Sequence, residues 1–171
     1  MPATQDIPDA VFEETITKAV KEVFSTMLGQ PAIYQAVTAP NPLDSLALDH
    51  AHVVGTVGFI GSLNGLIYLY LDVKFAEQCA ANLLGMSAAE VADLGDEAVN
   101  DAIGELTNMT VGTFKNQLSD RGFPCKLTIP SILRGTNFSI EPISSATRRV
   151  YRFEIAGQPL IADLLMQPPG E

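Results

Sequence analysis

The chain has 171 residues, of which 47% are hydrophobic and 18% are charged, a composition that allows one domain with a full hydrophobic core. Its formal net charge of -10 argues against binding to nucleic acid or to an anionic membrane surface. No segment reaches about 18 uninterrupted apolar residues and no N-terminal apolar run follows a basic flank, so we expect neither a membrane span nor a signal peptide.

The first predicted element is a helix from Asp9 to Leu28. Its apolar residues recur with helical spacing, Asp9 itself is a suitable N-cap, and Gly29 is suitable for the position after the last turn. A short strand is expected from Ile33 to Thr38, and a loop from Pro40 to Leu48.

The residues from His50 to Leu71 predict a β-hairpin. Its first arm, Val53 to Ile60, is rich in β-forming residues, and its second arm runs from Leu66 to Leu71. The arms are joined through Asn64-Gly65, a dipeptide typical of two-residue hairpin turns. Glycines spaced along the first arm indicate a bulge or the close approach of another backbone.

Two helices and a short turn are expected after the hairpin. The first runs from Lys74 to Leu84 and is closed by Gly85. Ser87 and Glu90 fit a capping box, which would begin the short turn. The longest predicted helix then runs from Asp96 to Leu118 and ends near residues 119–122.

This longest helix carries a row of polar residues. At about 100° per residue, Asp101, Glu105 and Asn108 fall in one row opposite the apolar side, and Gly112 continues that row without a side chain. Such a row is most simply a solvated face. Two details favour a functional one, because Gly104 and Gly112 each cost about 1 kcal/mol against alanine in a helix interior and asparagine is a poor helix former.

The C-terminal third predicts further strands. Residues 126–129 predict a short strand that Pro130 ends, and residues 134–140 predict a loop with a weak strand. A second hairpin is expected from residues 149–156 and 160–166, with Pro159 confined to its edge.

The complete order of elements is α-β-β-β-α-α-β-β-β-β. This order predicts an α+β fold with a largely antiparallel β-sheet and long helices packed on one face. We expect a single domain over residues 1–171, with loose tails at residues 1–8 and 167–171.

One pair of histidines was weighed as a metal site. His50 and His52 would share one face of a strand, with Asp49 nearby, and a metal-dependent hydrolase would be the corresponding function. No third ligand stands at a useful spacing, although a catalytic zinc site usually has three protein ligands. We therefore predict no metal site and interpret the pair as a solvated strand start.

Two other groups were given structural interpretations. Arg148, Arg149 and Arg152 form a basic cluster, for which a solvated strand edge is favoured over a phosphate site. Cys79 and Cys125 lie far apart in unlike contexts, which indicates buried thiols in a reducing compartment rather than a disulfide or a metal pair.

The polar row also matches a known pattern. Asp101-Ala-Ile-Gly-Glu105-Leu-Thr-Asn108 fits Asp/Ser-x3-Glu-x2-Asn, and the sequence resembles the CheC/CheX/FliY chemotaxis phosphatases that carry this pattern. In that family the pattern continues with a proline, for which Pro130 in TIPSILRG is suitable. The stretch GFIGSLNGLIYLYLDVKFAEQCAANLLG is similar to the family's hairpin-then-helix unit, so the resemblance spans roughly residues 9–166 and implies a CheC/CheX-like fold.

The number of motifs separates the branches of this family. CheC-like members carry two motifs on two helices, whereas the first helix here has Asp9 and Glu13 at the motif spacing but Ile16 in place of the asparagine. One active motif is therefore expected, as in CheX-type proteins, which are typically homodimers joined through their sheets. The acidic pair is either a relic of a second motif or a chance occurrence in a first helical turn.

The resemblance implies a cytoplasmic phosphatase that hydrolyses the phosphoaspartate of a CheY-like response regulator. Asn108 would orient the attacking water, Glu105 would contact the regulator's active-site lysine, and Asp101 and Gly112 would contribute to partner binding. The chain would need no cofactor of its own, because the regulator would supply Mg²⁺. The alternative is a non-catalytic module that uses the same helix face to bind a response regulator or a flagellar-switch protein.

Overall fold

The computed structural model describes residues 7–35, 50–137, 140–141 and 146–167. The helices are α1 (Asp9–Leu28), α2 (Val73–Leu84), α3 (Ala88–Leu94) and α4 (Asp96–Asp120). The strands are β1 (Ala32–Gln35), β2 (His52–Gly61), β3 (Gly65–Asp72), β4 (Cys125–Leu127), β5 (Ser131–Gly135), β6 (Thr147–Ile155) and β7 (Gln158–Met166). Of the tails predicted at residues 1–8 and 167–171, residues 1–6 and 168–171 lie outside the described residues, as does the predicted loop at residues 40–48.

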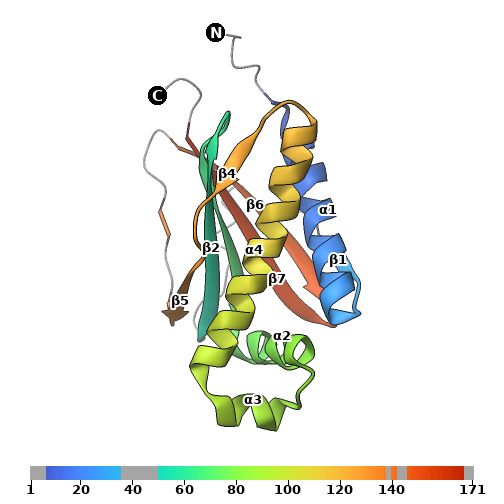
Figure 1. Cartoon of the computed structure of the whole chain (residues 1–171), viewed down its shortest axis with the longest axis vertical. Helices are drawn as coiled ribbons and strands as arrows, with labels where there is room; N and C mark the ends of the chain where they lie inside the picture. The colour runs from blue at the N-terminus through green and yellow to red at the C-terminus, as the bar shows by residue number, and fades with distance from the viewer. Residues whose placement is uncertain (1–6, 36–49, 138–139, 142–145, 168–171) are drawn as a thin grey trace.

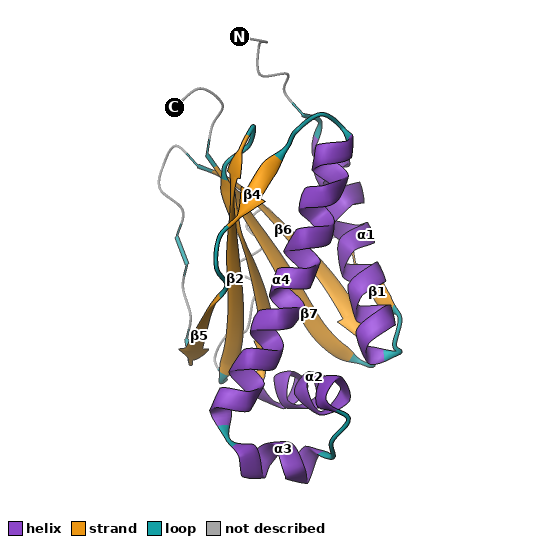
Figure 2. Cartoon of the chain, viewed as in Figure 1, coloured by secondary structure: helices purple, strands orange, loops and turns teal. Residues whose placement is uncertain are grey.

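The strands form one sheet of seven, in the order β1-β6-β7-β3-β2-β4, and β5 also pairs with β2. All the pairings are antiparallel. Figure 1 shows α1 and α4 side by side over one face of this sheet, with α2 and α3 near the start of α4. Figure 2, coloured by secondary structure, shows the layer of helices and the layer of strands. The predicted α+β fold, with helices on one face of an antiparallel sheet, is confirmed.

The boundaries of α1 are those predicted, but its N-cap is not. Gly29 ends the helix with φ 64°, as expected for a residue in the left-handed region. The prediction that Asp9 is the N-cap is wrong, because Pro8 occupies that position and no side chain caps the helix. Asp9 Oδ1 instead accepts hydrogen bonds from Arg149 Nη2 at 2.6 Å and Nε at 2.9 Å. A charged donor competes successfully with the backbone for this carboxylate.

The two hairpins and the capping box form as predicted, except that the first hairpin has a wider connection than an Asn-Gly turn. Phe59 pairs with Gly65, so residues 60–64 join the arms and Gly65 belongs to β3. Ser87 Oγ accepts a hydrogen bond from the Glu90 backbone N–H, and the Glu90 carboxylate accepts one from the Ser87 N–H. Pro159 lies in β7 where only β6 is its neighbour, because β3 pairs with β7 only as far as Ile161. The missing N–H of proline therefore interrupts no pairing with β3.

Two strands differ from the prediction. β1 covers residues 32–35, and the predicted continuation to residue 38 lies outside the described residues. β5 begins at Ser131, immediately after Pro130, whereas the sequence predicted a loop with a weak strand only from residue 134. Proline ends β4 but leaves the chain extended, so pairing with β2 resumes at the next residue.

The main hydrophobic core lies between the helices and the sheet. It is built from the inward side chains of both layers, among which the largest that are almost fully buried are Ile16, Phe24, Phe59, Ile67, Leu69, Ile103, Leu106, Phe114, Leu118 and Phe153. Each side chain of this kind contributes about 1.5–3 kcal/mol by leaving water. This burial fixes how α4 is rotated on the sheet.

The glycines of the first hairpin arm permit close contacts, as the sequence predicted. At Gly61 the neighbour is another backbone, because a Cβ there would lie 2.5 Å from the Pro124 carbonyl oxygen, and at Gly55 the neighbour is a side chain. A Cβ at Gly55 would lie only 2.0 Å from Thr107 Oγ1 and 3.0 Å from Thr107 Cβ. Thr107 is fully buried, and its hydroxyl donates to the Ile103 carbonyl at 2.6 Å. Helix α4 can therefore approach β2 only because residue 55 has no side chain.

Gly55→Ala should destabilise the protein by about 1–3 kcal/mol, the range for overpacking a tight core contact. Gly104→Ala is the matched control, since its Cβ would meet only Ile132 Cδ1 at 4.0 Å and alanine is the better helix former. Urea unfolding of both variants measures the difference. Equal stability of Gly55→Ala and the wild type would contradict this account of the α4–β2 contact.

Candidate functional site

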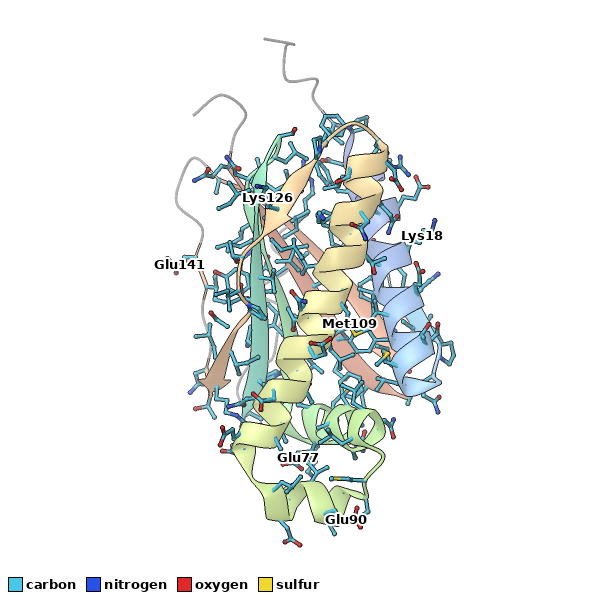
Figure 3. The ribbon with its side chains drawn as sticks, viewed as in Figure 1. Lys18, Glu77, Glu90, Met109, Lys126 and Glu141 are labelled. Carbon is cyan, nitrogen blue, oxygen red and sulfur yellow. The ribbon has the colours of Figure 1, made fainter. Side chains whose placement is uncertain are left out.

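The polar row predicted on the longest helix lies on the exposed side of α4. Asp101 and Glu105 are exposed, and Asn108 and Gly112 are partly exposed. Within the described part of the chain, no hydrogen bond or ion pair engages the side chains of Asp101, Glu105 or Asn108. The structure thus brings the four residues together on one surface and leaves their polar groups available to another molecule. Met109, labelled in Figure 3, marks the level of Asn108 on α4.

The opposite side of α4 holds the row in this orientation. Ile103 and Leu106 are at most 1% exposed, so a rotation of the helix would expose both of them. Thr107 and Thr110 are also fully buried, and each hydroxyl is satisfied by donating to the carbonyl four residues earlier. Because the buried polar atoms have partners inside the helix, this face carries no unpaired hydroxyl against the core.

The first turn of α4 is attached to the sheet edge by Arg134 of β5. Its Nε donates to Asn100 Oδ1, and its Nη1 lies 3.5 Å from Asp96 Oδ1. Sequence reasoning missed this residue, because it treated position 134 as the start of a loop. The only feature of the sequence that could have indicated its role is the alternation of exposed and inward residues after Pro130, which fits a strand.

A bulge in the sheet edge lies beside the row. β4 and β5 both pair with β2, and the segment between them, residues 128–130, is fastened by Thr128. The Thr128 N–H donates to the Gly58 carbonyl and the Gly58 N–H donates to Thr128 Oγ1, each at 2.8 Å. Lys126 of β4, labelled in Figure 3, shows where this edge runs past α4.

The first helix does not provide a second site of the same kind. Ile16 is fully buried, so the position that corresponds to Asn108 holds an apolar core side chain. Asp9 is engaged by Arg149, as described above. The expectation of one complete motif therefore agrees with the geometry of α1.

The interpretation as a solvated strand start holds for His50, which is exposed, but is wrong for His52, which is only 7% exposed. His52 lies in β2 where this strand pairs with both β3 and β5. Its Nδ1 lies 2.8 Å from the His50 carbonyl oxygen. Among the described residues, no group of three or more histidine, cysteine, aspartate or glutamate side chains is arranged to hold a metal ion.

The arginine cluster is not a solvated strand edge, because Arg148, Arg149 and Arg152 are each only partly exposed. Arg148 donates to both oxygens of Asp163, at 2.9 and 2.6 Å, and the Tyr70 hydroxyl donates to Asp163 Oδ2 at 3.0 Å. Asp163 is fully buried, and burial, together with this carboxylate, raises the pKa of Tyr70. Neighbouring Arg149 points to the opposite face of the sheet, towards α1.

The two cysteines are buried free thiols, as predicted. Burial raises the pKa of Cys79 to about 12, which keeps it protonated and unreactive near neutral pH. Within the described ranges, no helix is both long and apolar enough to cross a bilayer.

Comparison with known proteins identifies the fold and the family. The family model for the chemotaxis phosphatase CheX matches residues 53–154. The CheY-P phosphatase CheX of Thermotoga maritima is 27% identical over 134 residues, which cover 78% of this chain and 81% of that protein.

Solved structures show the same fold. The chemotaxis protein CheX from Desulfovibrio desulfuricans superposes with a TM-score of 0.74 at 22% identity, covering 91% of this chain and 99% of that one. A chain of the CheX–CheY–BeF3–Mg²⁺ complex from Borrelia burgdorferi gives a TM-score of 0.68 at 21% identity, covering 92% of this chain and 98% of that one.

Proposed function

Because the chain belongs to the CheX family of chemotaxis phosphatases, we propose that it hydrolyses the phosphoaspartate of a CheY-like response regulator. The observation that carries the proposal is the row on α4, in which an exposed carboxylate and a partly exposed carboxamide lie one turn apart. Neither group is engaged by a described side chain, so both are available to a partner. The Thermotoga maritima relative is a CheY-P phosphatase, which supports the same reaction here.

The reaction requires little chemistry from this chain. The oxygen of a water molecule attacks phosphorus, the bond from phosphorus to the aspartate oxygen breaks, and the products are inorganic phosphate and a free aspartate. The regulator supplies the acyl phosphate, the Mg²⁺ and a lysine. What this chain would add is the position of the water, and most of the gain from such placement is orientational.

Asn108 is suited to hold that water. A carboxamide donates and accepts hydrogen bonds at once, so it can bind a water hydrogen and a water lone pair together. A glutamine orients the attacking water of small GTPases in the same manner. Since α4 is held at this level by a packed core, the amide would enter the partner's site from a rigid support.

Glu105 and the ends of the row would fix how the partner sits. The Glu105 carboxylate would make a charge-assisted contact with the regulator's lysine. Asp101 would support the contact at the N-terminal side, and Gly112 would leave room for the partner's loops. Packing inside the chain does not require this glycine, because a Cβ there would make only an ordinary 3.9 Å contact with Leu127.

The encounter should be transient. This chain has a net charge of -10, and a partner whose active site is acidic gains no long-range attraction from it. The direct experiment is to mix the full chain with a phosphorylated receiver domain and follow phosphate release. Accelerated release supports the phosphatase, whereas binding without acceleration would support the non-catalytic module instead.

Glu105→Ala should weaken binding to the phosphorylated regulator by roughly tenfold, since a hydrogen bond to a charged group contributes about 1.5–3 kcal/mol. Glu22→Ala, which removes the same exposed carboxylate from α1, is the matched control and should bind like the wild type. Calorimetric titration of both variants measures the affinities. An unchanged affinity for Glu105→Ala would count against the lysine contact.

A homodimer joined through the sheet is part of the same proposal. Strand alternation directs Ile60, Leu66 and Leu133 away from the helices, and each is 40–60% exposed. A hollow of about 540 Å³, lined largely by apolar groups that include Leu66 and Leu165, lies on this side of the β2–β3 hairpin. These features support association through the sheet, which the molecular mass in solution would test.

A further inference from the structure

The most exposed large apolar side chain of the described residues lies beside the polar row. Ile129 is 87% exposed, more than any other exposed large hydrophobic residue in the described ranges. A single exposed isoleucine would need no explanation by itself. Its backbone setting and its position distinguish this one.

Ile129 is held in a bulge rather than in a loose loop. Thr56 of β2 pairs with Ser131, and Phe59 pairs with Leu127, so two residues of β2 oppose the three residues 128–130. The extra residue forces the edge outward, which is how bulges redirect side chains next to functional sites. Both hydrogen bonds between Thr128 and Gly58 fix one side of the bulge.

Pro130 restrains the other side. Its ring fixes its own φ near about -65° and keeps the preceding residue extended. The backbone that carries Ile129 is therefore restrained before binding, which lowers the entropy cost of ordering it against a partner.

The contacts of α4 with the edge strands locate this bulge along the helix. A Cβ placed on Gly104 would lie 4.0 Å from Ile132 Cδ1, and a Cβ placed on Gly112 would lie 3.9 Å from Leu127 Cδ1. Residues 128–130 lie between these two contacts, and Asn108 lies midway between the two glycines. The bulge therefore flanks the helix at the level of Asn108.

We propose that Ile129 is the apolar anchor that seats the receiver domain of the regulator, by packing on an apolar patch beside its phosphorylated aspartate. This inference rests on the proposed function. The row itself is polar and acidic and contributes almost no apolar area, while two acidic partners gain nothing from charge attraction. An apolar side chain on a restrained backbone at the rim supplies the missing attraction and acts as a positioning residue, because it holds the receiver against the row.

The test is the KM and kcat of phosphate release, measured with the full chain and a phosphorylated receiver over a range of receiver concentrations. Ile129→Ser should raise KM roughly tenfold, whereas kcat at saturating receiver should stay close to the wild-type value. Ile33→Ser makes the same change at the far edge of the sheet, where the side chain is 58% exposed, and should leave KM unchanged. Ile129→Leu should restore a low KM.

The outcomes separate this inference from the proposed function. If the wild type does not accelerate phosphate release, the proposed function fails and the inference fails with it. If the wild type is active and Ile129→Ser has the same KM, only the anchor is overturned. An equal rise in KM for Ile33→Ser and Ile129→Ser would also overturn the anchor. The loss of any exposed apolar side chain would then weaken binding, wherever it lies on the sheet. Unfolding curves of the variants should match, since both side chains are largely in solvent.

Discussion

Replacing Asn108 with alanine should reduce the stimulated loss of phosphate from the regulator to the regulator's own spontaneous rate, a fall on the order of 100-fold or more. Binding should change little, because Glu105 and the rest of the row remain in place. The reason is that alanine keeps the helix but can neither donate to the attacking water nor accept from it. Single-turnover decay of the phosphorylated regulator measures the rate, and titration measures the affinity.

The matched control for this variant is Asn116→Ala. Asn116 is exposed on the same helix, two turns further on, and its replacement removes the same amide group. It should retain the wild-type rate. Full activity of Asn108→Ala would refute the water-positioning role, and equal losses in both variants would point to an effect on the helix rather than on the water.

Replacing Asp163 with alanine should destabilise the fold by about 3–5 kcal/mol, the cost of leaving a buried charge without its partner. The bidentate bonds from Arg148 and the bond from the Tyr70 hydroxyl all end on this carboxylate, which is fully buried. The Arg148 side chain is only 15% exposed, so solvent replaces little of what is lost. Urea unfolding, with the slope checked for a two-state transition, gives the free energy of unfolding.

A double variant separates the charge effect from the packing effect. Arg148→Met combined with Asp163→Leu removes both charges and should be less destabilising than Asp163→Ala alone, because no unpaired charge remains. A loss below about 1 kcal/mol in Asp163→Ala would contradict the account, since it would place the pair among ordinary surface ion pairs.

The polar row was predictable because local periodicity decides it. Ile103 and Leu106 define the buried side of α4, and the period of the helix then places Asp101, Glu105 and Asn108 outside. The hairpins and the capping box were likewise readable, since short spacings in the sequence determine them. The range of α1 was also readable, but its N-cap was not, because Pro8 takes that position and Asp9 accepts from the distant Arg149.

What the sequence did not reveal depends on which strands become neighbours. Arg148 and Arg149 are adjacent in sequence but face opposite sides of the sheet, so each finds its own carboxylate, and no spacing rule identifies Asp163 as one of them. β5 returns to β2 after Pro130 and pairs with it as far as His52, a pairing that a proline in the sequence conceals. The bulge that presents Ile129 likewise depends on the pairing of both β4 and β5 with β2.

The structure of this chain bound to a regulator that carries BeF3⁻ and Mg²⁺ would test the water-positioning role most directly. The Asn108 carboxamide should lie within about 3 Å of a water in line with the bond from the regulator's aspartate to beryllium. A complex in which Asn108 lies outside the interface, or in which a different residue holds that water, would contradict the role of the α4 row.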